Sequence, residues 1–116
     1  MIKKSKKARK RGRMVRDLDA AARQEVFERD GHVCVRCRDT KRGIQWAHIF
    51  SRRHKNLRWE PDNALTLCAG CHIFWHQYPL LAVDWFKTTW PERYEHILTI
   101  FNSGMRIRVE DLHAEL

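Results

Sequence analysis

The fold of this chain is decided by residues 34–76, CVRCRDTKRGIQWAHIFSRRHKNLRWEPDNALTLCAGCHIFWH. One Cys-x-x-Cys pair, Cys34 with Cys37, opens the segment, and a second pair, Cys68 with Cys71, lies near its end. A two-residue spacer lets both sulfurs of a pair reach the same ion, so two such pairs suit one tetrahedral zinc. We therefore predict that a structural Zn²⁺ holds the two ends of the segment together.

The length and composition indicate one small domain. A chain of 116 residues buries only a modest core, which a metal site would reinforce. In a reducing compartment, four cysteines with this spacing are expected to be zinc ligands rather than disulfides. We find no apolar run long enough to span a bilayer, and the N-terminus is too charged to contain the apolar part of a signal peptide. We expect a soluble, cytoplasmic protein with no membrane partner.

The net charge of +9 is concentrated at one end of the chain. Residues 1–16 contain nine Lys or Arg and no acidic residue, whereas the remaining chain is balanced, with fourteen basic and fourteen acidic residues. Charge repulsion and the scarcity of apolar residues predict that this basic arm is disordered when free. Such an arm would neutralise phosphates and give salt-dependent binding to nucleic acid. A solubilising tail or a localisation signal is the alternative interpretation.

Beyond the arm, the sequence predicts a mixture of helices and two short strands. A first helix is expected over 17–31, with Asp19 as its N-cap and Gly31 as its stop. Pro91 is suited to a first helical position, and Gly104 to the position just past a helix end. The end of the chain is ambiguous between an extended piece and a helical turn. The remaining expected elements are strands over 43–50 and 64–67 and helices over 68–78, 80–89 and 91–102.

Four polar side chains between and after the cysteine pairs suggest a second, reactive site. His48 falls near the end of the first expected strand, and its imidazole titrates near physiological pH, as a base that activates water requires. His72 and His76 lie four residues apart on one helix face, where two imidazoles can bind one divalent ion. Asn63 could fix the loop, orient the His48 ring or ligate the metal. Together they offer the base and the cation that hydrolysis of a phosphodiester needs.

A basic loop over residues 51–58 supplies candidate phosphate contacts. Arg52, Arg53, Lys55 and Arg58 could hold the phosphates that neighbour the scissile one. A solvated basic loop is the alternative for each of them taken singly.

This arrangement resembles the HNH nuclease family, in the subgroup with two zinc-binding Cys-x-x-Cys pairs. The resemblance covers about residues 24–77, and His48, Asn63 and His72 correspond to the H, N and H of the family name. It implies an α+β fold, in which a small zinc-stapled ββα-metal (His-Me finger) core carries flanking helices. Residues 17–116 would then form a single nuclease domain, with a motif core over 32–77 and C-terminal helices over 80–103.

The resemblance also implies a function, namely metal-dependent hydrolysis of DNA. A catalytic Mg²⁺ or Mn²⁺ is implied beside the structural Zn²⁺, with His48 as general base, Asn63 as loop organiser and His72 as metal ligand. The segments AHIFSRRH and DNALTLCAGCH resemble the corresponding segments of phage-encoded members, including recombination nucleases that act on branched DNA. Double-stranded or branched DNA is therefore the expected substrate, and phage packaging or recombination proteins are the expected partners.

One departure from the family pattern keeps other interpretations open. Many members have Asp or His as a metal ligand just before the base histidine, where this chain has Ala47, which cannot coordinate. Either His76 or Asn63 completes the metal site, or the ion is held weakly. The alternative to an enzyme is a non-catalytic, zinc-stapled nucleic-acid-binding module. A third interpretation is a structural zinc domain that binds a protein partner through its tryptophan-rich helices.

Overall fold

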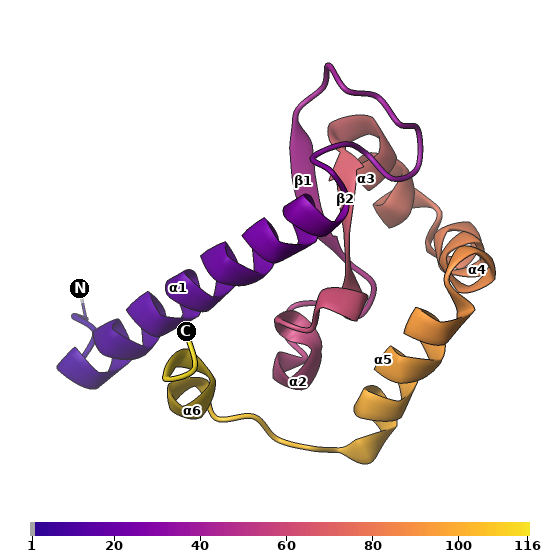
Figure 1. Cartoon of the computed structure of the whole chain (residues 1–116). Coiled ribbons are helices and arrows are strands. Elements are labelled where there is room, and N and C mark those ends of the chain that lie inside the picture. Colours follow the sequence, from indigo (N-terminus) through magenta and orange to yellow (C-terminus); the bar gives the residue numbers. More distant parts are fainter. Residues whose placement is uncertain (1) are drawn as a thin grey trace.

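The computed structural model describes residues 2–116, and Figure 1 shows the course of the chain. A long helix leads into a hairpin-like pair of strands, and shorter helices then follow one another around one side of that pair. The elements in order are α1 (Lys6–Arg29), β1 (Ile44–His48), α2 (Lys55–Arg58), the 3₁₀ turn η1 (Pro61–Asn63), β2 (Ala64–Cys68), α3 (Ala69–Gln77), α4 (Pro79–Thr89), α5 (Pro91–Ser103) and α6 (Val109–His113).

The two strands and α3 form the centre of the fold. β1 and β2 pair antiparallel, with His48 opposite Ala64 and Ile44 opposite Cys68. Every residue of β2 is buried, so other elements cover both faces of this strand. Two short strands are not stable alone in water, and here they depend on the helices around them. The predicted small α+β fold, with a ββα core that a metal can hold, is confirmed.

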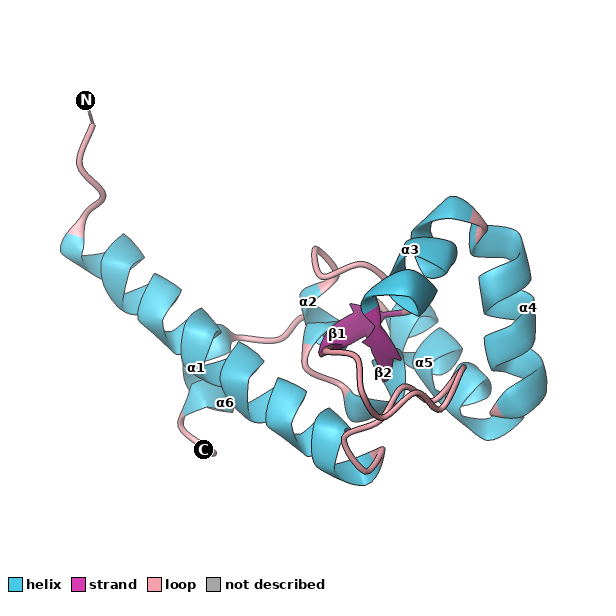
Figure 2. Ribbon diagram, turned by 90° about the horizontal axis from the view of Figure 1, so that it is seen from above, coloured by secondary structure: helices cyan, strands magenta, loops and turns pink. Residues whose placement is uncertain are grey.

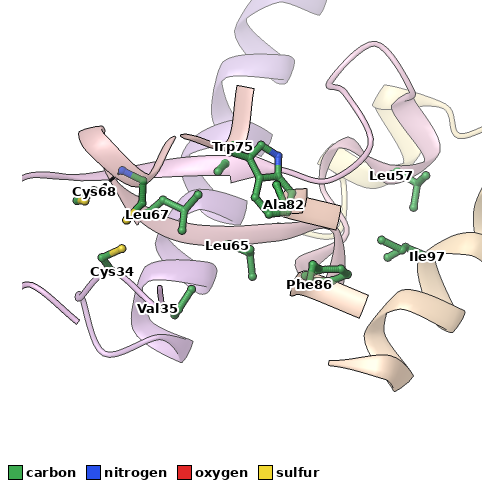
Figure 3. Packing of buried hydrophobic residues seen from close by; sticks show 12 residues of the cluster. Cys34, Val35, Leu57, Leu65, Leu67, Cys68, Trp75, Ala82, Phe86 and Ile97 are labelled. Carbon is green, nitrogen blue, oxygen red and sulfur yellow. Dashed lines mark hydrogen bonds between the residues drawn. The ribbon is translucent and has the colours of Figure 1, made fainter. Parts of the chain in front are cut away.

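Buried side chains form two clusters, one on each face of the strands. The larger lies between β2 and the helices α3, α4 and α5, and Figure 3 shows most of its members. Leu65, Leu67, Trp75, Phe86 and Ile97 are its largest fully or nearly fully buried side chains. The smaller cluster joins α1 to α6 and consists of Leu18, Ala22, Trp59 and Val109, with Trp46 packed against it.

The C-terminal end of α1 is fastened to β2. The helix ends in a Schellman motif, in which the His32 amide donates to the Phe27 carbonyl and Gly31 has a left-handed φ of 72°. Beyond the last turn, the Asp30 carboxylate accepts from the Thr66 amide at 3.0 Å. Arg29 donates to the Ala64 carbonyl at 2.8 Å. These bonds fix how α1 lies across the strand.

The start of α1 corrects two expectations. The helix begins at Lys6 rather than Asp17, so the expected disorder is wrong for residues 6–16, and Ser5 rather than Asp19 is the N-cap. Lys, Arg and Ala are good helix formers. The packed half of α1 also supplies the nucleus, so each added residue only has to propagate a helix that already exists.

The other boundaries agree with expectation, apart from two short helices. The loop over 51–58 contains the single turn α2, and the ambiguous C-terminal end contains α6. Pro91 is the first residue of α5, and Gly104, with a φ of 66°, caps that helix. Of the helices in residues 2–116, none combines the length and the apolar character that crossing a bilayer requires.

Candidate active site

The four cysteine sulfurs gather at one end of the strands. They all lie within 4.8 Å of one another, and the sulfurs of Cys37 and Cys68 are 3.7 Å apart. Four sulfurs bound tetrahedrally at about 2.3 Å from one zinc would be spaced at about 3.8 Å. All four cysteines are free thiols. Their number, their chemistry and their spacing therefore fit a structural zinc.

Backbone and side-chain donors around the sulfurs also suit bound thiolates. The amide of Cys37 points at the sulfur of Cys34, and that of Cys71 at the sulfur of Cys68, each at 3.5 Å. The Arg36 guanidinium donates to the Cys71 sulfur at 3.4 Å, and its cation offsets part of the charge that four thiolates would bring. Cys68 is also the N-cap of α3, so the cluster fixes where this helix begins.

A cleft beside β1 brings the predicted reactive residues together. It has a volume of about 460 Å³, and its lining includes His48, Arg52, His72, Trp75 and His76. Alternation along β1 places His48 on the face toward α1, whereas the other two histidines come from α3 on the opposite face. The cleft therefore extends around the edge of β1. The side chains of His48, His72 and His76 line the same cleft only once the two strands and α3 have folded together.

The His48 ring is held in one orientation. Its Nε2 lies 3.0 Å from the carbonyl oxygen of Arg58. A carbonyl only accepts, so Nε2 carries the hydrogen and Nδ1 of the neutral ring keeps its lone pair. The Trp46 ring packs edge-on at 4.2 Å between centroids, and the Trp75 indole donates to the His48 backbone carbonyl at 3.0 Å. One nitrogen of the ring is thus left available as a base.

Burial keeps the His48 ring neutral. Desolvation, with a smaller contribution from the nearby cations Arg52 and Arg58, lowers the pKa of His48 to about 4. The hydrogen bond to the Arg58 carbonyl acts in the opposite direction but is outweighed. At neutral pH the imidazole is therefore unprotonated, which is the form that accepts a proton.

His72 and His76 form a pair of candidate metal ligands. Their Nε2 atoms lie 3.1 Å apart, and two nitrogens bound to one ion at about 2.1 Å and near a right angle would be about 3 Å apart. The other ring nitrogen of His72, Nδ1, lies 2.7 Å from the Gln45 side-chain oxygen and donates to it. Burial lowers the pKa of His72, and the His76 charge lowers it further. The two Nε2 atoms therefore lie at a separation that one bound ion could span.

Asn63 is committed to the loop that follows β1. It is fully buried, and its Oδ1 accepts from the Phe50 amide at 2.9 Å. Its Nδ2 donates to the carbonyls of Phe50 and Leu57, each at 3.0 Å. All of these bonds lie within the protein, so the amide faces the loop and not the histidine pair.

Ala47 occupies the position of the missing ligand. Its side chain is buried in the larger cluster, on the face of β1 that is turned away from His48. Of the two groups considered as replacements, Asn63 is used by the loop, and only His76 stands beside His72.

The four basic residues expected to bind phosphate separate in the structure. Arg52 lines the cleft beside β1, whereas Arg53 and Lys55 line a second hollow. Arg58 is used inside the protein, because Asp19 accepts from its guanidinium at 2.9 and 2.7 Å. Burial alone would raise the pKa of Asp19, but the bonds from Arg58 and Trp59 outweigh it and lower that pKa. In this structure the Arg58 guanidinium is therefore engaged with Asp19, and its contact with phosphate stays a prediction.

Three residues near the cleft were missed by the sequence interpretation. Gln45 orients His72, Trp75 holds the backbone of His48, and Asp19 fixes the residue whose carbonyl holds the His48 ring. Asp19 and Arg58 are separated by 39 positions, and no local pattern connects residues so far apart.

The fold and the site define a class of protein. A pair of strands and a helix, with four cysteines at one end and three histidines lining one cleft, has the arrangement of a ββα-metal unit. Residues 34–83 match the family model described as HNH endonuclease, so this part of the chain is similar to that family. The family is one of nucleases, so nucleic acid is the class of substrate. No curated protein and no solved structure matches the chain significantly.

Proposed function

We propose that this protein is a metal-dependent endonuclease that hydrolyses phosphodiester bonds in DNA. The observation that carries the proposal is the shared cleft, which His48, His72 and His76 all line. A source in a phage genome, with packaging or recombination proteins as partners, remains part of the hypothesis.

In this proposal the residues of the chain have separate tasks. His48 accepts a proton from water at Nδ1, while the Arg58 carbonyl holds its Nε2. Arg52, at the wall of the same cleft, binds a phosphate of the DNA strand. Asn63 keeps the loop between His48 and Arg52 in one shape through its bonds to Phe50 and Leu57.

His72 and His76 would hold the divalent ion, with Gln45 fixing the His72 ring. When bound, Mg²⁺ or Mn²⁺ supplies positive charge that stabilises the phosphate and the leaving 3′ oxygen. Two imidazoles are a sparse ligand set for such an ion. The proposal therefore includes weak metal binding, with phosphate oxygens of the DNA completing the coordination.

One observation favours a second candidate, a nucleic-acid-binding module without catalysis. Ala47 is buried and offers no ligand where many relatives have one. A binding module, however, has no need for a neutral buried imidazole beside two others in the same cleft. We therefore place the enzyme first.

A plasmid-nicking assay separates the two candidates. We expect the zinc-loaded protein to convert supercoiled DNA to the nicked form when Mg²⁺ or Mn²⁺ is added. We expect His48→Ala to lose at least a hundredfold in rate, as is typical for removal of a general base, while still binding DNA. His96→Ala is the matched control, because His96 pairs with Asp62 and does not line the cleft.

Two results of this assay would count against the proposed endonuclease activity or against the assay itself. If the folded, zinc-loaded protein shifts DNA in a gel and cuts none of it under any divalent ion, the binding module is the better description. Equal losses in His48→Ala and His96→Ala would show that the assay does not report on this cleft.

A further inference from the structure

The first half of α1 is a helix that stands apart from the rest of the chain. Figures 1 and 2 both show its N-terminal end extending away from the sheet, with only α6 lying beside this half of the helix. Residues 6–11 are exposed, and packing begins at Met14 and Val15, which contact the smaller cluster. The basic segment is thus helical, although almost none of its side chains is buried.

This segment carries a concentrated and largely uncompensated positive charge. No acidic residue occurs in its first turn or anywhere before Asp17. Within residues 2–116, the one ion pair that involves its cations joins Arg11 to Glu110 at 3.8 Å, and both side chains are nearly half exposed. Cations at the N-terminal end of a helix also oppose the helix dipole and repel one another at i, i+4 spacing. An anion bound along the segment would relieve both effects.

The distribution of the cations around the helix favours a groove over a flat surface. At about 100° per residue, the cations cover an arc of about 220°, and Ala8, Gly12 and Val15 fill the remaining side. A flat anionic surface contacts one side of a helix, whereas the two phosphate backbones that border a DNA groove contact both flanks. The major groove, about 12 Å wide, admits an α-helix. The cations are Lys6, Lys7, Arg9, Lys10, Arg11, Arg13 and Arg16.

The same helix is connected to His48 through a single residue, Arg58. Asp19 of α1 binds the Arg58 guanidinium, and the Arg58 carbonyl accepts from His48. From Asp19 to Lys6 the helix rises about 20 Å, which corresponds to about six base pairs of B-DNA. The basic segment is therefore held at a fixed distance from the cleft, within reach of the same duplex.

We propose that residues 6–16 of α1 form a helix that lies in the major groove of duplex DNA and reaches up to about six base pairs to one side of the cleft. The inference rests on the DNA-cleaving function proposed above, and it specifies duplex DNA as the substrate and a one-sided footprint. The binding is independent of base sequence, because most of the contacts are to phosphates.

The test uses the full-length, zinc-loaded chain on a His48→Ala background, so that the DNA stays intact. One variant, called the arm variant, combines Lys7→Gln, Lys10→Gln and Arg13→Gln. Glutamine removes the charge of each side chain and keeps its helix propensity. The control combines Arg23→Gln, Lys87→Gln and Arg108→Gln, which lowers the net charge equally at exposed positions outside the segment. Affinity for a 24-base-pair duplex and for a single strand of the same length is measured by fluorescence anisotropy over a salt series.

We expect the arm variant to bind the duplex at least about tenfold more weakly than the control, with a salt slope reduced by about 2.7, since three phosphate contacts are lost. The single strand should show a smaller difference between the two variants. Dimethyl sulfate methylates guanine N7 in the major groove, and the parent protein should protect the duplex from this reaction more than the arm variant does.

Three results would overturn the proposal. If the arm variant and the control lose the same amount of affinity for the duplex, binding depends on the total charge of the protein and not on the position of that charge. Equal weakening on duplex and single strand, with unchanged dimethyl sulfate protection, would assign the segment to phosphates without a groove. Arm-dependent binding to phosphatidylserine vesicles, with no arm effect on DNA, would assign it to a membrane surface.

The inference can fail separately from the proposed function. If the parent chain with His48 intact does not cut plasmid DNA but the arm still governs duplex binding, the catalytic proposal fails and the groove helix stands. If the same three arm substitutions, made with His48 intact, leave plasmid cutting unchanged, and the arm variant also keeps its duplex affinity, the groove helix alone is rejected.

Discussion

Removal of the Asn63 amide should destabilise the protein by several kcal/mol. Asn63→Ala breaks three hydrogen bonds, which are the one from the Phe50 amide and the two to the Phe50 and Leu57 carbonyls. Asn63 itself is fully buried, so the amide and the carbonyl of Phe50 would lose this partner, whereas the Leu57 carbonyl also accepts from the Glu60 amide at 3.2 Å. At about 1 to 2 kcal/mol for each of the two orphaned groups, the free energy of unfolding should fall by about 2 to 4 kcal/mol.

Urea unfolding of the zinc-loaded protein, followed by tryptophan fluorescence, measures this loss. With a slope of about 2 kcal/mol per molar urea, the midpoint should fall by about 1 to 2 M. Asn56→Ala is the matched control, because this half-buried amide makes a single hydrogen bond of 3.3 Å to the Ile100 carbonyl. The control should lose about 1 kcal/mol or less.

A second substitution at the same position tests the direction of the hydrogen bonds. Asn63→Asp keeps the acceptor for the Phe50 amide but turns a carboxylate oxygen toward two carbonyl oxygens. We expect a loss at neutral pH as large as that of Asn63→Ala, with partial recovery on acidification, because the protonated carboxyl can donate one bond. A loss below 1 kcal/mol for Asn63→Ala would refute the assignment of this residue as the anchor of the loop.

Three further perturbations test the metal sites and the base. Gln45→Leu should weaken Mn²⁺ binding by about tenfold or more, measured by electron paramagnetic resonance of the free ion, whereas Gln45→Glu should retain it; equal affinities would remove Gln45 from the site. Cys68→Ser should abolish stoichiometric zinc and unfold the domain, and a folded, zinc-free variant would contradict this. Because the pKa of His48 is lowered to about 4, the ring is neutral above pH 5, and cleavage by the folded protein should decline only as the pH falls toward 4. An acid limb with its midpoint near 6.5 would mean that the base is an exposed imidazole.

The sequence alone determined the parts of this protein that depend on local spacing. The two Cys-x-x-Cys pairs predicted one metal site, because a two-residue spacer fixes how far apart two sulfurs can lie. Helical periodicity placed His72 and His76 on one face, and their Nε2 atoms are 3.1 Å apart. Pro91 and Gly104 marked the ends of α5, because each has few alternatives at its backbone angles.

Only the tertiary structure decided which residues support the candidate site. The orientation of His48 depends on Arg58 and through it on Asp19, and the His72 ring depends on Gln45, which lies 27 positions away. The helical start of α1 depends on a nucleus that later residues pack into place. These features come from contacts between distant segments, and their partners can be identified only once burial has brought the segments together.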